Sequence, residues 1–155
     1  MWADFARTIA SPIGELTIRS DGERICALEF GAAESRRDGL PVLLQAEAEL
    51  TEYFAGRRRR FSVPLCMKGT AFQLQVWRAL GEIPYGETVS YGQLAARIGR
   101  PRACRAVGMA NNRNPLPIFV PCHRVVGADG SLRGYAGGLK AQRILLELEG
   151  RNVEV

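Results

Sequence analysis

The sequence predicts an α+β protein: a small N-terminal β-meander with one helix, followed by a larger and mostly helical part. The first thirty residues alternate between apolar and polar side chains as β-strands do, whereas apolar residues after residue 69 recur at helical spacing. A chain of 155 residues can bury one core, or two small cores packed together, without disulfides or metal. We therefore expect two domains, residues 1–68 and 69–155.

The N-terminal part is expected to contain strands separated by turn signals at residues 11–14 and 21–22. An amphipathic helix should follow from Pro41 to Phe54, and Gly56 should end it. Its apolar positions recur every three or four residues, at Leu43, Ala46, Leu50 and Tyr53/Phe54. The segment 61–65 is a possible short strand at a sheet edge, where its proline is tolerated.

Two capping boxes mark helix starts in the second half. Thr70 and Ser90 are each followed three residues later by a glutamine, Gln73 and Gln93, which can bond back to the free backbone N–H of the cap. The second of these helices should end at Gly99, and Pro101 suits the first position of a third helix.

The second and third helices, joined through Gly99, match a helix-turn-helix pattern. The third helix carries small residues at i, i+3, i+4 and i+7, namely Ala103, Ala106, Val107 and Ala110. Residues 125–138 form a loop or a wing, and residues 139–149 a closing helix. The expected C-terminal domain is therefore a helical, winged helix-turn-helix domain.

Charge is concentrated over the same residues. The chain has 21 Lys and Arg against 16 Asp and Glu, and no acid lies between Glu87 and Asp129. This acid-free segment holds six arginines, at positions 97, 100, 102, 105, 113 and 124. Such a block is typical of proteins that bind a polyanion, and the alternative is an ordinary solvated basic face.

The four cysteines lie far apart in the sequence, without a C-x-x-C pair and with a single histidine, so we expect no metal. Cys122 differs from the other three because His123 and Arg124 follow it. A neighbouring base or positive charge favours the thiolate, which is the nucleophilic form. The residues alone leave two interpretations open, a reactive thiol and an inert buried cysteine.

The segment Pro121–Val126 resembles the active-site motif P-C-H-R-[VI] of the O6-alkylguanine-DNA alkyltransferases, also called methylated-DNA–protein-cysteine methyltransferases. Further segments resemble motifs of this family in the family's order, densely from residue 69 to residue 150. They are 69–73, 76–77, 83–86, 90–95, 105–108, 114–115, 134–138 and 145–150. The N-terminal part resembles the family's RNase H-like domain more loosely.

This resemblance implies roles at the site. Cys122 would accept the alkyl group, His123 would take its proton through water, and Glu149 would orient His123. Tyr91 would donate a proton or hydrogen bond to the departing guanine, and Asn114 would tie the active-site segment to the helix-turn-helix. The pocket wall would comprise Pro117, Val125, Tyr135, Ala136 and Gly137. Some members have serine at the position of Ala136, which leaves the preferred lesion open.

The same resemblance implies double-stranded DNA containing O6-alkylguanine as partner, and O4-alkylthymine as a further substrate. Arg105 would fill the gap left by an extruded base, because a thiol cannot reach an alkyl group inside a duplex. The third helix would lie in the minor groove. The expected DNA-contacting residues are Tyr91, Arg102, Ala103, Arg105, Ala106, Gly108, Ala110 and Arg124. The transfer would be stoichiometric and irreversible, with no cofactor and no metal.

Two other classes of function compete with this interpretation. A winged-helix DNA-binding regulator would use the basic block but not the Cys-His pair, and a thiol hydrolase would turn over small esters. Alkyltransferase-like relatives lack the cysteine that this chain has at Cys122. The first residues do not resemble a signal peptide and no apolar run is long enough for a membrane, so we expect a cytoplasmic location. We also expect a monomer and leave open whether it binds DNA cooperatively.

Overall fold

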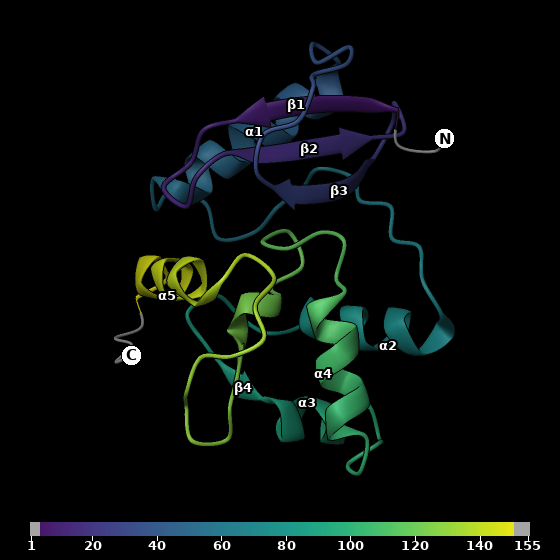
Figure 1. Cartoon of the computed structure of the whole chain (residues 1–155), viewed down its shortest axis with the longest axis vertical. Helices are drawn as coiled ribbons and strands as arrows, with labels where there is room; N and C mark the ends of the chain where they lie inside the picture. The colour runs from purple at the N-terminus through teal and green to yellow at the C-terminus, as the bar shows by residue number, and fades with distance from the viewer. Residues whose placement is uncertain (1–3, 151–155) are drawn as a thin grey trace. The chain divides into compact units, whose positions relative to one another are not determined.

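Residues 4–150 are described by the computed structural model of the chain, which divides into two compact units between Met67 and Lys68 (Figure 1). The N-terminal unit contains three antiparallel strands in the order β1 (Phe5–Ile9), β2 (Leu16–Ser20) and β3 (Ile25–Phe30). This is the predicted β-meander. Leu16 and Ile18 of the central strand are completely buried.

Helix α1 (Pro41–Phe54) lies against one face of this sheet and contacts all three strands (Figure 1). Its bounds are as predicted: Pro41 occupies the first turn, and Gly56 follows the helix with a positive φ of 76°. The side chains of Leu43, Ala46 and Leu50 are buried, which confirms the predicted apolar face.

The predicted edge strand at 61–65 is wrong. Only Leu65 forms an isolated bridge to Ile25, with Ile25 N–H donating to the Pro64 carbonyl. The preceding residues are held by a side chain instead, because the Glu49 carboxylate accepts the backbone N–H groups of Ser62 and Val63. A side-chain acceptor on a helix thus replaces a strand partner.

In the C-terminal unit, helices α2 (Ala71–Leu80) and α3 (Tyr91–Arg97) begin at complete capping boxes. The Thr70 hydroxyl accepts from Gln73 N–H at 3.1 Å, and the Ser90 hydroxyl accepts from Gln93 N–H at 3.0 Å. Both predicted helix starts are therefore confirmed. The closing helix α5 (Leu139–Leu148) is also confirmed. No helix within residues 4–150 is long and apolar enough to cross a membrane.

The third helix, α4, runs from Cys104 to Asn112, so the prediction that Pro101 occupies its first position is wrong. Ala103 N–H donates to the Arg100 carbonyl at 2.9 Å, which makes residues 100–103 a turn with proline at its second position. Proline favours that position because its fixed φ suits the turn. Pro101 therefore lies in this turn, and the helix begins after it, at Cys104.

The region predicted as a loop or wing, residues 125–138, starts with a short strand. Strand β5 (Val125–Val126) pairs in parallel with β4 (Val89–Ser90), just before α3. Parallel pairing needs a long crossover between strands, and here α3 and α4 lie within it. This pairing sets the segment that carries Cys122 beside the start of α3.

Candidate active site

Cys122 lies in a single 3₁₀ turn, η1 (Cys122–Arg124), directly after the buried segment 116–120. Asn114 organises that segment: its amide donates to the Val120 carbonyl at 2.8 Å and its side-chain oxygen accepts from Leu116 N–H at 2.9 Å. Between these two contacts Ile118 has a φ of +75°, a strained value for a β-branched residue. Asn114 therefore helps to hold a strained turn in front of the thiol.

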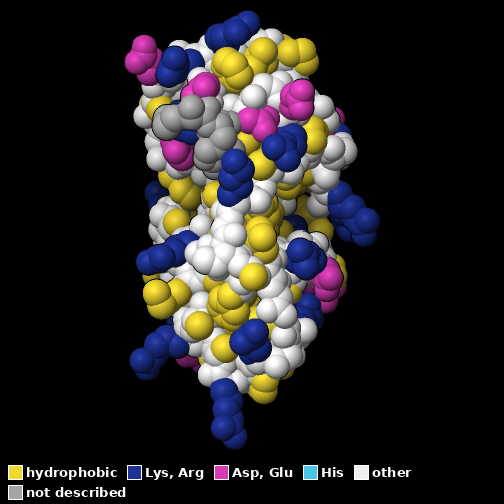
Figure 2. Space-filling view, turned by 90° about the vertical axis from the view of Figure 1, so that its right-hand side faces the viewer, with side chains coloured by type: hydrophobic (Ala, Val, Ile, Leu, Met, Phe, Trp, Pro, Cys, Tyr) yellow, Lys and Arg dark blue, Asp and Glu magenta, His cyan; other side chains and the backbone are white. Residues whose placement is uncertain are grey.

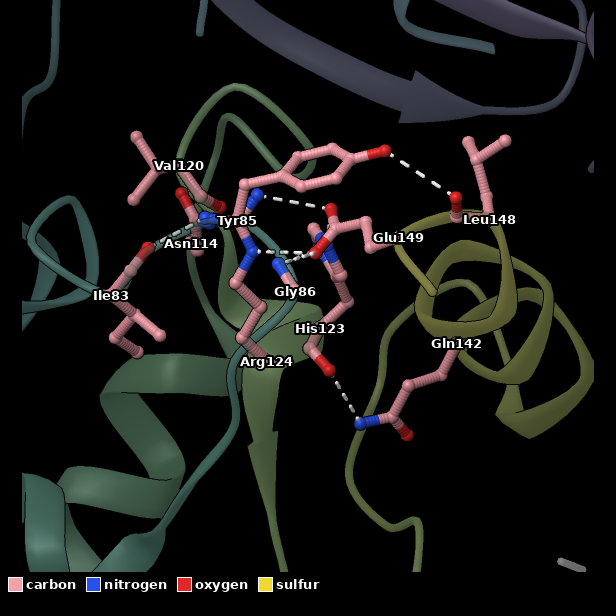
Figure 3. A network of polar contacts seen from close by, with 10 residues as sticks. All are labelled: Ile83, Tyr85, Gly86, Asn114, Val120, His123, Arg124, Gln142, Leu148 and Glu149. Atoms are coloured by element: carbon pink, nitrogen blue, oxygen red, sulfur yellow. Dashed lines mark hydrogen bonds and ion pairs between the residues drawn. The ribbon is translucent and has the colours of Figure 1, made fainter. Parts of the chain in front are cut away.

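The imidazole of His123 is completely buried and lies 2.8 Å from Glu149, between Nε2 and Oε2 (Figure 3). Because a carboxylate can only accept, Nε2 carries the ring proton and donates it. The other nitrogen, Nδ1, has no hydrogen-bond partner among residues 4–150. His123 thus presents an acceptor nitrogen, the form that a general base requires.

Arg124 also binds Glu149, contrary to the predicted DNA contact. Its Nε donates to Oε1 at 2.8 Å and its Nη2 to Oε2 at 3.0 Å, while Nη1 donates to the Ile83 carbonyl at 2.6 Å (Figure 3). The side chain is buried, so this guanidinium faces the interior and not a phosphate backbone. We reassign Arg124 from DNA contact to the positioning of Glu149.

Burial and hydrogen bonding set the ionisation of these groups. Burial raises the pKa of Cys122 to about 11, although a hydrogen bond from Asn114 opposes the shift. Burial also lowers the pKa of His123 below 6.5, against the effect of Glu149. Burial would raise the pKa of Glu149, but hydrogen bonds from His123 and Arg124 outweigh it and hold that pKa far below 4.5. At neutral pH the site therefore holds a thiol, a neutral imidazole and a carboxylate.

Helix α5 contacts this turn at two points. The Gln142 amide donates to the carbonyls of His123 and Val125, both at 3.1 Å, and Glu149 caps the C-terminal end of the helix. Glu149 Oε1 also accepts from Gly86 N–H at 3.3 Å, which ties it to the loop before β4 (Figure 3). Sequence reasoning missed Gln142, because an isolated glutamine on a helix carries no signal of its own.

Tyr91 is the first residue of α3, and its hydroxyl donates to the Arg133 carbonyl at 2.8 Å. Burial raises the pKa of its hydroxyl, and the nearby Cys122 charge adds to this effect.

Of the predicted pocket residues, Pro117, Val125 and Tyr135 are buried. The Tyr135 ring lies edge-on to the His123 ring, with 6.4 Å between the ring centroids. Ala136 and Gly137 lie at the surface end of the same loop.

Helix α4 and the turn before it present the predicted DNA-contacting residues unevenly. Arg102, Arg105 and Ala106 are exposed, whereas Ala103 and Gly108 are partly exposed. Ala110 is buried and its carbonyl accepts from the Trp77 indole at 2.8 Å, so its predicted place on a DNA-contacting surface is wrong. Figure 2 shows one face of the molecule, where dark blue Lys and Arg side chains project from the lower part, the C-terminal unit, with little magenta between them.

The fold brings together two cysteines that lie 40 positions apart in the sequence. Ligand atoms of Asp21, Cys26 and Cys66 all lie within 4.8 Å of one another in the N-terminal unit. The wide spacing of the cysteines was therefore a poor argument against a metal, because spacing along a chain does not fix distance in a fold. Burial, followed by the charge of Asp21, raises the pKa of Cys26 to about 11, which opposes the thiolate that a metal requires. The absence of metal stays a prediction.

The C-terminal unit combines a buried cysteine, a histidine held by a carboxylate, and exposed arginines on α4 and in the turn before it. These features define a class of nucleophilic thiol proteins with a nucleic-acid-binding surface. Residues 71–151 match the family described as 6-O-methylguanine DNA methyltransferase, DNA binding domain, and residues 5–67 match its ribonuclease-like domain. The chain belongs to the family of methylated-DNA–protein-cysteine methyltransferases.

Individual relatives agree over nearly the whole chain. It is 45% identical to the constitutive methylated-DNA–protein-cysteine methyltransferase of Bacillus subtilis, covering 94% of this chain and 95% of the relative. It is 50% identical to the methylated-DNA–protein-cysteine methyltransferase of Mycobacterium bovis, over 92% and 90% of the two chains.

Solved structures give the same result. The crystal structure of Mycobacterium tuberculosis OGT in complex with DNA matches with a TM-score of 0.85 and 50% identity, over 93% of this chain and 91% of that one. S. pombe Atl1, in complex with damaged DNA containing O6-carboxymethylguanine, matches 57% of this chain and 83% of its own, with a TM-score of 0.50 and 34% identity. The predicted α+β fold, with its ribonuclease-like and DNA-binding parts, is confirmed.

Proposed function

We propose that this chain repairs DNA by moving the alkyl group of O6-alkylguanine, and of O4-alkylthymine, onto Cys122 in one irreversible step. The observation that carries the proposal is the buried hydrogen bond between His123 Nε2 and Glu149 Oε2, one residue away from the thiol. Nucleophile, base and orienting carboxylate form the arrangement that activates a weak nucleophile. The similarity to OGT in complex with DNA and to Atl1 with damaged DNA supports alkylated DNA as the substrate.

In the proposed reaction, Cys122 Sγ attacks the alkyl carbon and the bond from that carbon to O6 breaks. The electron pair stays on the base, which takes a proton from Tyr91, and the thiol proton passes through water to His123 Nδ1. With a thiol pKa of about 11, few molecules hold the thiolate at neutral pH, so this transfer has to accompany the attack. The thioether product is stable, so each chain would act once and need no cofactor.

Glu149 serves this transfer in two ways. It fixes the His123 tautomer with Nδ1 free to accept, and its charge stabilises the imidazolium that forms. The bidentate contact with Arg124 holds the carboxylate in one orientation. The Tyr91 hydroxyl must break its hydrogen bond to the Arg133 carbonyl before it can donate to the base. This exchange would involve the loop that carries the pocket residues Tyr135, Ala136 and Gly137.

DNA would reach the site through the exposed surface of α4, with Ala103, Ala106 and Gly108 close to the minor groove. Small side chains allow the backbone to approach the sugars, and Arg102 would contact a phosphate. Arg105 would occupy the gap that the extruded base leaves. Extrusion is required because the alkyl carbon of a stacked base cannot meet a buried thiol.

The direct test is the intact mass of the chain after mixing with excess duplex that contains one O6-methylguanine. We expect the mass to rise by one methylene unit and then stop, with peptide mapping assigning the methyl group to Cys122. Continued turnover, or hydrolysis of small thiol-reactive esters at comparable rates, would support the hydrolase interpretation instead. Binding without any mass change would support a DNA-binding regulator.

Cys104 provides a matched control, because its thiol is exposed on α4 while Cys122 is buried. A simple chemical alkylation would favour the exposed thiol. We expect Cys104→Ser to keep full transfer and Cys122→Ala to abolish transfer while keeping DNA binding. Loss of methylation in Cys104→Ser, with methylation kept in Cys122→Ala, would overturn the proposal.

We further propose that residues 1–68 and 69–155 are the two domains and that the chain acts in the cytoplasm as a monomer.

A further inference from the structure

Two thiols of the N-terminal unit, Cys26 and Cys66, take no part in the proposed reaction. Leu65 forms a parallel bridge to Ile25, and Cys66 N–H donates to the Ile25 carbonyl at 2.8 Å. The next pair in this register is Cys26 and Cys66, and their sulfur atoms lie within 4.8 Å of each other. The backbone contacts therefore hold two free thiols side by side.

This arrangement suits a disulfide between the two thiols. Neighbouring positions on paired strands have Cα atoms about 5 Å apart, within the range that a disulfide spans. The N-terminal unit contains no other cysteine, because Cys104 and Cys122 belong to the C-terminal unit. Each thiol of the pair therefore has one partner within its own unit.

The two thiols differ in their charged neighbours. The hydrogen bond with Asp21 raises the pKa of Arg24, and the charge of Cys66 adds to this effect, so the guanidinium acts on the Cys66 sulfur. A cation beside a thiol promotes its reactivity. Burial, followed by the charge of Asp21, instead holds the pKa of Cys26 at about 11. Cys66 is therefore the thiol that reacts first.

A small oxidant can reach Cys66 by local opening, although 5% of its surface is exposed in the closed state. The segment 61–66 is held by the bridge to β3 and by backbone N–H groups that donate to the Glu49 carboxylate. Segments held by few contacts open with free energies below that of global unfolding. Such an opening exposes Cys66 while β3 keeps Cys26 in place.

We propose that Cys26 and Cys66 form a reversible disulfide when hydrogen peroxide oxidises the chain. Cys66 Sγ attacks one peroxide oxygen, the O–O bond breaks and one water leaves, so that Cys66 becomes a sulfenic acid. Cys26 Sγ then attacks this sulfur, the S–O bond breaks and the thiol proton leaves in a second water. The two thiols together lose two electrons and two protons, and the peroxide becomes two waters.

The disulfide closes the loop from Cys26 to Cys66, which contains helix α1. A closed loop restricts the unfolded chain, so the melting temperature of the N-terminal unit should rise by roughly 10 °C. The alkyl acceptor Cys122 lies in the other unit and should stay a thiol.

The experiment adds hydrogen peroxide to the folded chain, stops the reaction with catalase, unfolds the chain and labels the remaining thiols with N-ethylmaleimide. Peptide mapping should find Cys26 joined to Cys66, a label on Cys122, and separation of the joined peptides by dithiothreitol. Melting curves before and after oxidation test the expected rise. These measurements do not depend on alkyl transfer, so their failure is distinguishable from failure of the proposed function.

Cys104→Ser is the matched control, because it removes the exposed thiol and should keep the link between Cys26 and Cys66 at the wild-type rate. Cys66→Ser should abolish both the link and the rise in melting temperature. A link through Cys104 or Cys122, labels on both Cys26 and Cys66 after peroxide, or a disulfide that forms only in urea would overturn the inference. If Cys66→Ser does not fold, Cys66→Ala replaces it, and the mapping of the wild-type chain still decides the pairing.

Discussion

Replacing Glu149 by glutamine tests whether the carboxylate works on the proton transfer or only on the fold. The change keeps the shape of the side chain but removes a charge that is hydrogen-bonded at 2.8 Å to His123 and at 2.8 and 3.0 Å to Arg124. Arg124 would remain buried without its counter-charge. Breaking a buried pair in this way costs about 3–5 kcal/mol, and we expect the lower end because the amide oxygen can still accept.

Two magnitudes follow from Glu149→Gln. At roughly 2–4 °C per kcal/mol for a chain of this size, a loss of about 3 kcal/mol lowers the melting temperature by roughly 6–12 °C. The single-turnover rate should fall by about a hundredfold, within the range of general acid–base effects, because the imidazolium would form beside an uncompensated guanidinium. Affinity for duplex DNA should change little, since neither Glu149 nor Arg124 is exposed.

The assay is rapid-quench transfer from an O6-methylguanine duplex, with fluorescence anisotropy for binding, both well below the melting temperature. Glu147→Gln on the same helix is the matched control, because Glu147 is exposed and its carboxylate lies 3.8 Å from Arg143. It should leave the rate and the stability unchanged. A rate loss in Glu149→Gln no larger than its loss of affinity would refute the orienting role and leave a structural one.

Three further predictions concern other parts of the chain. Arg105→Ala should slow repair of a fully paired O6-methylguanine far more than repair of one in a mismatch, because unpairing costs a few kcal/mol only in paired DNA. Arg102→Ala should instead weaken binding to both duplexes alike and reduce the slope of log affinity against log salt concentration by about one. Equal rate losses on both duplexes in Arg105→Ala would contradict the proposed role of Arg105 in filling the gap left by the base. His123 is the chain's one histidine and its pKa lies below the unfolded value of 6.5, so the unfolded state binds the extra proton and stability should fall as pH drops below 6.5. Melting temperatures between pH 7.5 and 5.5 should show this loss, and His123→Gln should flatten it; an equal slope in both would argue against a buried neutral imidazole. Elemental analysis of the purified chain should find no bound zinc, and one zinc per chain that disappears in Cys66→Ser would contradict this.

Local signals in the sequence predicted those parts of the fold that depend on neighbouring residues. The hydroxyl and amide of a capping box act within four residues, so the starts of α2 and α3 could be located from Thr70 and Ser90 alone. The start of α4 could not, because Pro101 suits both a first helical turn and a β-turn. Only the bond from Ala103 N–H to Arg100 distinguishes the two.

The non-local parts of the site were harder to predict. The resemblance supplied Cys122, His123 and Glu149, but nothing in the sequence indicated that Arg124 turns inward to share that carboxylate. Arginine is common on surfaces, and its burial depends on an acceptor 25 positions away. The approach of Cys26 to Cys66 was missed for the same reason, since distances between remote residues follow from the sheet and the connecting chain.

Helix α5 touches the reactive turn through Gln142 near its start and Glu149 at its end, so the reactivity of the thiol is linked to the docking of one helix. Short helices at the edge of a fold open transiently with free energies below that of global unfolding. Each such opening would release the imidazole from its carboxylate while the rest of the unit stayed intact. Amide hydrogen exchange along residues 139–148 therefore measures how much of the time the base is correctly held.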